Sequence, residues 1–294
     1  MTAVNATKRP SIFSHLIDTG AHQKMLAFAS LVLLLVGFSI ASPNFMQMSN
    51  MLAILQATSV NGVLAVAATL VIITGGIDLS VGTLMTFCAV IAGVILTKAG
   101  LPLPLGLIGA IGAGALCGLT SGTLVAKAKI PPFIATLGMM LVLKGLSLVI
   151  SGTRPIYFND TPGFDQIARG SLIGEIFPAF PVPNGVLILF LIAGAAAYIL
   201  SRTVLGRYTF ALGSNEESVR LSGVNTEAWK MGIYALAGGI CGVAGILIAS
   251  RLNSAQPALG LGYELEAIAA VVIGGTSLAG GRGTIMGTLI GALI

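Results

Sequence analysis

The chain has 294 residues, of which 55% are hydrophobic and only 9% are charged, and its mean hydropathy is +0.98. This composition excludes a monomeric water-soluble protein and indicates an integral membrane protein. The net charge of +5 could suggest a nucleic-acid-binding protein, but the basic residues stand at the ends of apolar segments, which is typical of membrane orientation.

The first 24 residues are polar and include Lys8, Arg9 and Lys24. The apolar run after them has no small-residue cleavage site, so we interpret 1–24 as a cytoplasmic segment before a retained first span. A single transmembrane domain, 25–294, follows. Runs of about 18 to 25 apolar residues predict an all-α polytopic fold with eight complete transmembrane helices, at 25–42, 49–74, 81–98, 104–126, 133–150, 184–201, 229–250 and 264–279. A ninth run starts near Thr284 and is still apolar at Ile294, so we expect the chain to be truncated in mid-span.

A possible helix break stands at the end of the second predicted span, in the sequence TGGIDLS at 74–80. A carboxylate costs about 2.5 to 3.5 kcal/mol at the centre of a membrane helix, so Asp78 is expected at an interface, hydrogen-bonded or facing water. Gly75 and Gly76 can break the helix, and Asp78 or Ser80 can cap the next one. Capping is the simpler interpretation, and direct contact with a transported solute is the alternative.

Uncharged polar residues also lie within the apolar runs. Their amides and hydroxyls suit a path for a neutral, hydrogen-bonding solute, although such groups more commonly join helices to each other. The candidates for the translocation path or the helix break are Gln56, Asn61, Gly75, Gly76, Asp78 and Ser80.

Two longer polar stretches interrupt the apolar runs, at 151–183 and at 202–230. In the second, Ser214 precedes Glu217 by three residues, which is the spacing of a capping box, and Gly223 can supply the positive φ that ends a helix. The sequence therefore predicts about two turns of helix between two membrane segments. Because so short a helix is not stable alone, we interpret it as a docking site for a cytoplasmic partner.

The positive-inside rule places the N-terminus in the cytoplasm. In that orientation ten basic residues lie on the inner side and four on the outer side, and Lys144 is left inside a span. The stretch 202–230 is then a cytoplasmic coupling loop. The stretch 151–183 lies on the outer side, where it is either a compact surface for a soluble partner or an ordinary connection.

Residues for catalysis are missing from the predicted spans. Both histidines, His15 and His22, precede the first span, and Asp78 has no second intramembrane aspartate with which to share a proton. The chain has no G-x-x-x-x-G-K-[ST] sequence, and we interpret the glycines at 274–275 and 280–283 as a helix break and a turn. We therefore expect neither enzyme activity nor a cofactor or metal in this chain.

Four separated motifs occur along the chain. They are ITGGIDLSVG at 73–82, PPFIATLG at 131–138, GRYTFALGSNEE at 206–217 and YELEAIAAVVIGGTS at 263–277. In this order they resemble the ribose/xylose/arabinose/inositol group of ABC sugar-importer permeases. The resemblance runs from about the first span to Ile294.

The resemblance implies the permease subunit of an ATP-driven importer in the bacterial inner membrane. Such a subunit moves a monosaccharide, for example a ribose-like pentose, a hexose or inositol, to the cytoplasm by alternating access. It implies ten spans in the full fold, a homodimer, partner ATPase subunits that bind ATP and Mg²⁺, and a periplasmic sugar-binding protein, and it does not identify the sugar. The alternative, which the composition permits equally, is a stand-alone secondary transporter or channel for a small neutral polar solute.

The resemblance also implies where the ATPase binds. On the cytoplasmic side Glu216, Glu217 and Arg220 are candidate polar contacts and Val219 and Leu221 candidate apolar anchors, although a solvated helix would carry the same charges. The full set of ATPase-coupling candidates is Ser214, Asn215, Glu216, Glu217, Val219, Arg220, Leu221 and Gly223. On the outer side, arginine forks bind carboxylates bidentately. The candidates for binding-protein docking are therefore Arg154, Arg169 and Arg251, with lipid or loop contacts as the alternative.

Overall fold

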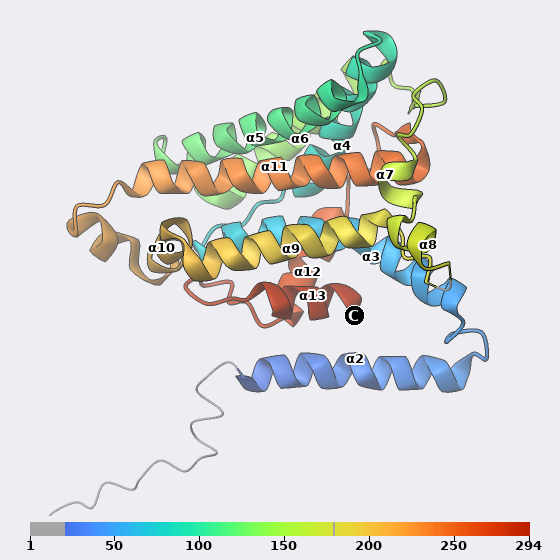
Figure 1. The fold of residues 1–294 in the computed structure, drawn as a ribbon. Helices are drawn as coiled ribbons and strands as arrows, with labels where there is room; N and C mark the ends of the chain where they lie inside the picture. The colour runs from blue at the N-terminus through green and yellow to red at the C-terminus, as the bar shows by residue number, and fades with distance from the viewer. Residues whose placement is uncertain (1–20, 179) are drawn as a thin grey trace, which may run out of the picture.

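The computed structural model describes residues 21–178 and 180–294, so the expectation for the N-terminal segment 1–24 falls almost wholly outside the described residues. Long helices lie side by side along one axis (Figure 1). The elements are α2 (Ala21–Ala41), α3 (Met48–Ile73), α4 (Val81–Gly93), the π-helix η1 (Val94–Lys98), α5 (Leu103–Ala126), α6 (Pro132–Ser151), β1 (Ile156–Tyr157), α7 (Gln166–Arg169), α8 (Leu172–Ile176), α9 (Asn184–Arg202), α10 (Val204–Leu221), α11 (Thr226–Leu252), β2 (Ser254–Ala255), α12 (Tyr263–Ile273) and α13 (Ile285–Leu293).

Six helices in the described part of the chain are long and apolar enough to cross a membrane: α3, α4 with its continuation η1, α5, α6, α9 and α11. They correspond to six of the predicted spans and differ from them by no more than about three residues at either end. The helix α2 matches the first predicted span, but its apolar part, Met25–Ala41, is shorter than the six.

The predicted span at 264–279 is wrong. Its helix, α12, ends at Ile273 because two glycines follow, and Gly275 has a φ of 88°, which ends the helix. The 11 residues of α12 and the nine of α13 reach only about 16 and 14 Å, less than the roughly 30 Å of a bilayer core. The expected count of eight complete spans is therefore not confirmed.

The core forms where α3, α4, α5 and α11 pack together. From Val60 to Ile73 all residues of α3 except Asn61 are buried. The helices α5 and α11 approach closely because glycines face each other, and a Cβ atom on Gly114 would lie 2.3 Å from the carbonyl oxygen of Gly238. Close glycine contacts of this kind hold membrane helices together by van der Waals packing, which explains why glycines are spread along the chain.

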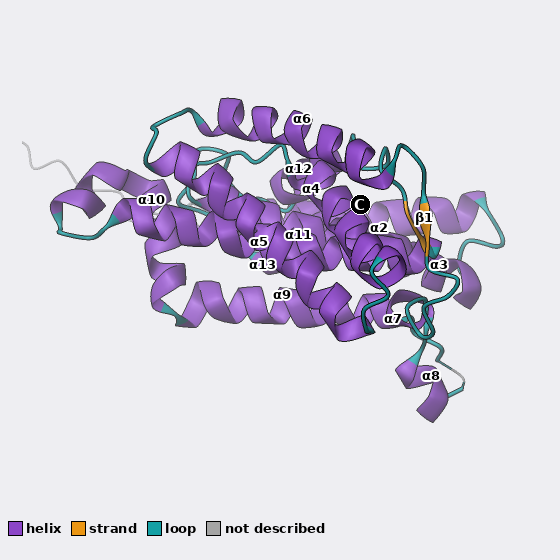
Figure 2. Ribbon diagram, turned by 90° about the horizontal axis from the view of Figure 1, so that it is seen from above, coloured by secondary structure: helices purple, strands orange, loops and turns teal. Residues whose placement is uncertain are grey.

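The two ends of the bundle differ. One end carries α10, and the other carries α7, α8 and the small sheet of β1 and β2 (Figures 1 and 2). We call them the α10 end and the α7–α8 end. At the α7–α8 end β1 pairs antiparallel with β2, Phe158 stacks on Phe164, and the Ser250 hydroxyl binds the backbone of the α7 region. Residues 156–169 are thus folded against the bundle rather than forming a free connection.

Candidate functional site

The predicted cytoplasmic helix is the second half of α10. Asn215 has non-helical angles, φ −163° and ψ 95°, and divides α10 into a first part at 204–214 and a tip at 216–221, which we call the α10 tip. The sequence analysis did not predict the first part, because its residues are less polar than a loop and too few for a span. Gly223 has a φ of 81°, as expected for the residue that ends the helix.

The cap of the α10 tip lies one residue later than predicted. The Asn215 Oδ1 atom accepts the Ser218 backbone N–H at 2.9 Å, whereas the Ser214 hydroxyl donates to the Phe210 carbonyl oxygen, also at 2.9 Å. The capping box of Ser214 and Glu217 is therefore wrong, because Ser214 still belongs to the preceding helical turn. Asparagine is as good an N-cap as serine, so the sequence signal alone could not decide between them.

Asn215→Ala is expected to loosen the α10 tip by about 1 kcal/mol, because the Ser218 N–H loses its acceptor. In hydrogen–deuterium exchange the amides of 216–221 should exchange about fivefold faster. Ser214→Ala is the matched control and should leave their exchange unchanged. Faster exchange in the Ser214 variant alone would show that the capping box is correct after all.

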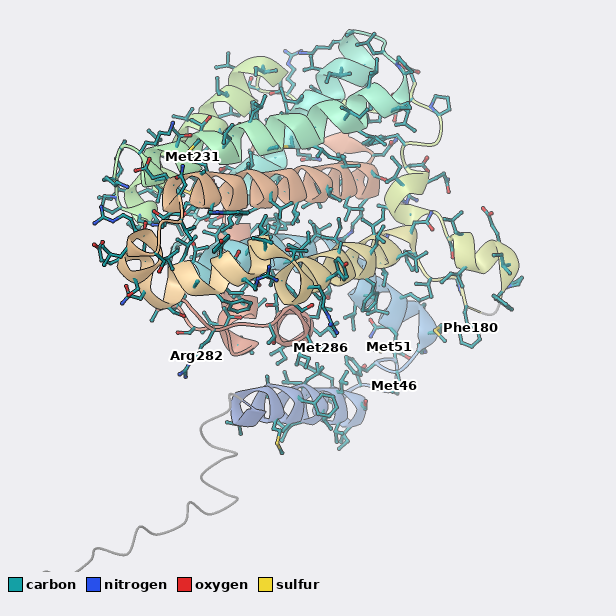
Figure 3. All side chains as sticks on the ribbon, turned by 60° about the vertical axis from the view of Figure 1, so that its left-hand side comes forward. Met46, Met51, Phe180, Met231, Arg282 and Met286 are labelled. Carbon is teal, nitrogen blue, oxygen red and sulfur yellow. The ribbon has the colours of Figure 1, made fainter. Side chains whose placement is uncertain are left out.

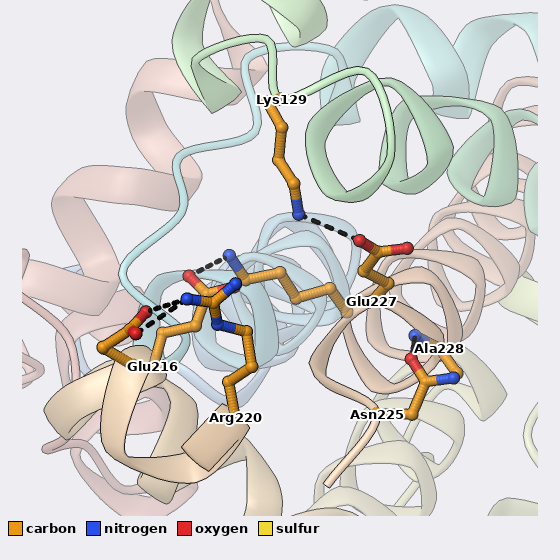
Figure 4. Close-up of polar contacts among 8 residues, drawn as sticks. Lys129, Glu216, Arg220, Asn225, Glu227 and Ala228 are labelled. Carbon is orange, nitrogen blue, oxygen red and sulfur yellow. Dashed lines mark hydrogen bonds and ion pairs between the residues drawn. The ribbon is translucent and has the colours of Figure 1, made fainter. Parts of the chain in front are cut away.

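The α10 tip has an inner and an outer charged side (Figure 4). On the inner side, Glu216 accepts from Lys230 of α11 at 2.5 Å, and the Lys230 side chain is only 16% exposed. On the outer side, Arg220 donates both its bonds to Glu217, at 2.7 and 2.9 Å, and these hydrogen bonds raise the pKa of the Arg220 guanidinium above its usual value. The first pair ties the tip to α11, and the second leaves both partners open to solvent.

The two predicted apolar anchors point in different directions. Val219 packs against the protein's own core, whereas Leu221 is 77% exposed. Only Leu221 is available to a partner in this arrangement. The outward residues of the tip are thus Glu217, Arg220 and Leu221.

The base of the tip contacts two other segments where helices are interrupted, the end of α3 and the turn between α12 and α13. A Cβ atom on Gly213 would lie 1.8 Å from the Ile73 carbonyl oxygen, which itself accepts the Gly281 N–H at 2.8 Å. A Cβ atom on Gly280 would lie 2.8 Å from the Gly75 nitrogen, and both Gly280 and Gly281 have positive φ. We call this contact of 73–75, 213–214 and 280–281 the glycine junction. The sequence indicated the helix breaks of the glycine junction separately, but it did not predict that they are in contact.

The break between α3 and α4 is buried and fully folded. Gly75 has a φ of 81°, and Asp78, which is 4% exposed, accepts both the backbone N–H of Ser80, at 2.8 Å, and its hydroxyl, at 2.6 Å. The Thr136 hydroxyl of α6 accepts the Leu79 N–H and lies 3.1 Å from the Ile77 carbonyl oxygen. Irregular backbone at membrane depth is tolerated where protein satisfies it, and this geometry is that of a turn clamp. Ser80 forms no side-chain bond to α4, so Asp78 rather than Ser80 holds the turn.

The polar candidates of α3 do not converge. Asn61 donates to the Glu266 carboxylate of α12, whereas Gln56 lies about 140° away around the helix. Within the described residues, four buried polar side-chain atoms have no partner: Asn61 Oδ1, Ser121 Oγ, Thr276 Oγ1 and the Tyr234 hydroxyl, which lies beside Gly76. Sequence analysis missed Tyr234 and Glu266, since their polarity stands out only when their neighbours are known.

The three predicted docking arginines lie at the α7–α8 end. Arg154 follows α6, Arg169 ends α7, and Arg251 belongs to the last turn of α11. In the part of the chain that the structure describes, they form no ion pair. Apolar side chains of α8 and its flank are also exposed here, including Phe180, which Figure 3 shows at this end.

Comparison with known proteins identifies relatives over most of the chain. The family model described as branched-chain amino acid transport system / permease component matches residues 50–294. The ribose import permease protein of Escherichia coli (strain K12) is 46% identical over 267 residues, which are 90% of this chain and 81% of the relative. The corresponding protein of Bacillus subtilis (strain 168) is 43% identical over 94% of this chain and 83% of its own length. The fructose import permease protein of Rhizobium meliloti is 41% identical over 90% of this chain and 74% of its own length. No solved structure matches the chain.

Proposed function

From the premise that this chain belongs to the family of branched-chain amino acid transport system / permease components, and within it to the ABC monosaccharide-importer permeases, we propose that it carries a monosaccharide across the bacterial inner membrane. The N-terminus lies in the cytoplasm, so the α10 end faces the cytoplasm and the α7–α8 end faces the periplasm. Two copies form the permease. The names of the relatives favour ribose or a related sugar.

The ATPase docks on the α10 tip. Its outward residues Glu217, Arg220 and Leu221 form the contact, and ATP and Mg²⁺ bind in the partner. The observation that supports this best is that the tip is solvent-exposed outside yet fixed inside by the ion pair between Glu216 and Lys230. When a partner displaces an exposed segment that is fixed to the core, the attached helices move with it, whereas a free loop changes conformation without moving them.

Movement of the tip reaches the membrane helices by two contacts. The pair of Glu216 and Lys230 connects the tip to α11, and Tyr208, packed on Trp229 at 4.8 Å between ring centroids, connects the first part of α10 to the same helix. The glycine junction connects it to the end of α3 and to the loop between α12 and α13. ATP-driven closure of the motor therefore rocks α3, α11 and α12 together, which opens the solute path alternately to the two sides.

The exchange Glu217→Arg with Arg220→Glu tests the docking surface. The double variant keeps an ion pair within the tip but inverts the charge pattern that a partner meets. Sugar-stimulated ATPase activity of the assembled complex should fall about tenfold or more, because like charges then face each other across the contact.

Another exposed ion pair in the described residues supplies the matched control. Lys129 and Glu227 lie at the same end, 3.1 Å apart, and exchanging them should leave coupling unchanged. Unchanged coupling in the Glu217 and Arg220 exchange would refute the docking assignment. Sugar uptake by the purified chain alone, without nucleotide, would instead favour a stand-alone transporter or channel.

A further inference from the structure

One basic residue stands in the interior of a long apolar helix. Lys144 lies 12 residues after the start of α6 (Pro132–Ser151) and seven before its end. Within the described residues its ammonium forms neither an ion pair nor a hydrogen bond. Charged side chains inside membrane segments are costly and face a bundle interior or a solute pathway, so this lysine needs a partner that the described residues do not supply.

The lysine borders a groove lined by hydroxyl groups. Lys144 and Ser147 of α6 face Thr83 and Thr86 of α4, and the segment 257–261 before α12 forms the other wall. The three hydroxyls are buried, and each donates its proton to a carbonyl oxygen three or four residues earlier in the chain. Their remaining lone pairs are therefore acceptors for a ligand, whereas the ammonium offers up to three donors.

A carboxylate stands beside the same groove. Glu264, in the first turn of α12, is 8% exposed and accepts only the Gly262 N–H in the part of the chain described. One of its oxygens lies 2.8 Å from where a Cβ atom on Gly82 would be, so it flanks the turn that carries Thr83. It lies too far from Lys144 for an ion pair. Non-helical backbone precedes α12, as in discontinuous helices that form transport sites.

We propose that this α4–α6 groove binds the transported monosaccharide and that Lys144 donates a hydrogen bond to one of its hydroxyl groups. The proposal rests on the proposed function and names a part of its solute path. The groove combines one cation and several hydroxyl acceptors, and the Glu264 carboxylate flanks it. Such a set suits a neutral polyhydroxylated solute, since an anion would meet Glu264 and a cation would meet Lys144.

The groove is closed in this conformation. No water molecule fits between its walls, so a sugar enters only when α6 separates from α4. The helix α6 lies at the edge of the bundle and packs mainly on α4 and α5 (Figure 2), so it moves without disturbing the contact of α3 with α11.

Lys144→Met tests the proposal in the complete transporter, reconstituted with its ATPase and binding protein. Methionine keeps an apolar stem, so insertion into the membrane is not impaired. Uptake of D-ribose should fall about 10- to 100-fold, because a hydrogen bond from a charged donor is lost. ATPase activity without sugar should remain. Lys127→Met, at an exposed position after α5, is the control and should transport normally.

Deoxy sugars separate sugar binding from a merely structural role. Uptake of 2-deoxy-, 3-deoxy- and 5-deoxyribose by the Lys144→Met variant is divided by wild-type uptake of the same sugar, which cancels losses in the binding protein. For one analogue, uptake by the variant should be almost equal to uptake by the wild type, because that analogue already lacks the hydroxyl that Lys144 binds. Unchanged D-ribose uptake, or an equal loss with every sugar, would overturn the assignment. Uptake that needs no ATPase would contradict the proposed function. The ratios of variant to wild-type uptake would still test whether the groove binds the sugar.

Discussion

Gly213→Ala is expected to reduce ATP-driven sugar uptake about tenfold or more. The new Cβ atom would lie 1.8 Å from the Ile73 carbonyl oxygen and 2.5 Å from the Gly281 nitrogen. Both are backbone atoms, which cannot rotate away as a side chain can, and they already bond to each other. The glycine junction must therefore open, at a cost of about 1 to 3 kcal/mol or more.

The measurement for Gly213→Ala compares uptake and thermal unfolding of the purified complex. Gly232→Ala is the matched control, because Gly232 lies on α11 near the same end and a Cβ atom there meets nothing within 4 Å. The control should behave as wild type or be slightly more stable. If the two variants behave alike, the glycine junction does not transmit motion from the α10 tip to α3.

Asp78→Ala is expected to lower uptake by about tenfold and to reduce stability. The carboxylate accepts two bonds from Ser80, and without it the Ser80 N–H is left without an acceptor in a buried turn. An orphaned buried donor costs about 1 to 3 kcal/mol. Asp78→Asn keeps an oxygen that accepts both bonds, so it should retain most of the activity.

The two substitutions at Asp78 separate capping from solute contact. If the charge itself contacts the sugar, Asp78→Asn should lose as much uptake as Asp78→Ala while the unfolding temperature stays near that of wild type. If the residue holds the turn, uptake and unfolding temperature should fall together and only in the alanine variant. Asp160→Ala, at an exposed carboxylate, controls for loss of a charge.

The sequence predicted the long helices well because each is a local property. Six predicted spans match described helices, since about 20 apolar residues form a helix in a bilayer whatever surrounds them. The helix break at Gly75, the break and turn at 274–283 and the stop at Gly223 were also foreseen, because positive φ is a requirement of the residue itself. Predictions failed where two local signals competed. At Ser214 and Asn215 both residues could cap the helix, and at 264–279 the apolar composition predicted a span although the glycines at 274–275 indicated a break within it.

The candidate site could be predicted only in part. The α10 tip was located by its polar residues, but which of them face outward depends on α11, where Lys230 turns Glu216 inward. The roles in docking and in the solute path stay predictions. The predicted spans likewise put Lys144 inside a span, but its position beside Thr83 and Thr86 follows only from the packing of α6 on α4.

Residue order by itself thus determined that this is a helical membrane protein with no nucleotide-binding P-loop, and the family to which it belongs. Hydrophobicity, helix propensity and glycine geometry act over a few neighbouring residues, so they can be read along the chain. The tertiary structure decided that Ile73, Gly213 and Gly281 form one junction and that Lys144 faces the hydroxyls of Thr83 and Thr86. Such contacts join residues tens to hundreds of positions apart, and they depend on how whole helices pack rather than on any local preference.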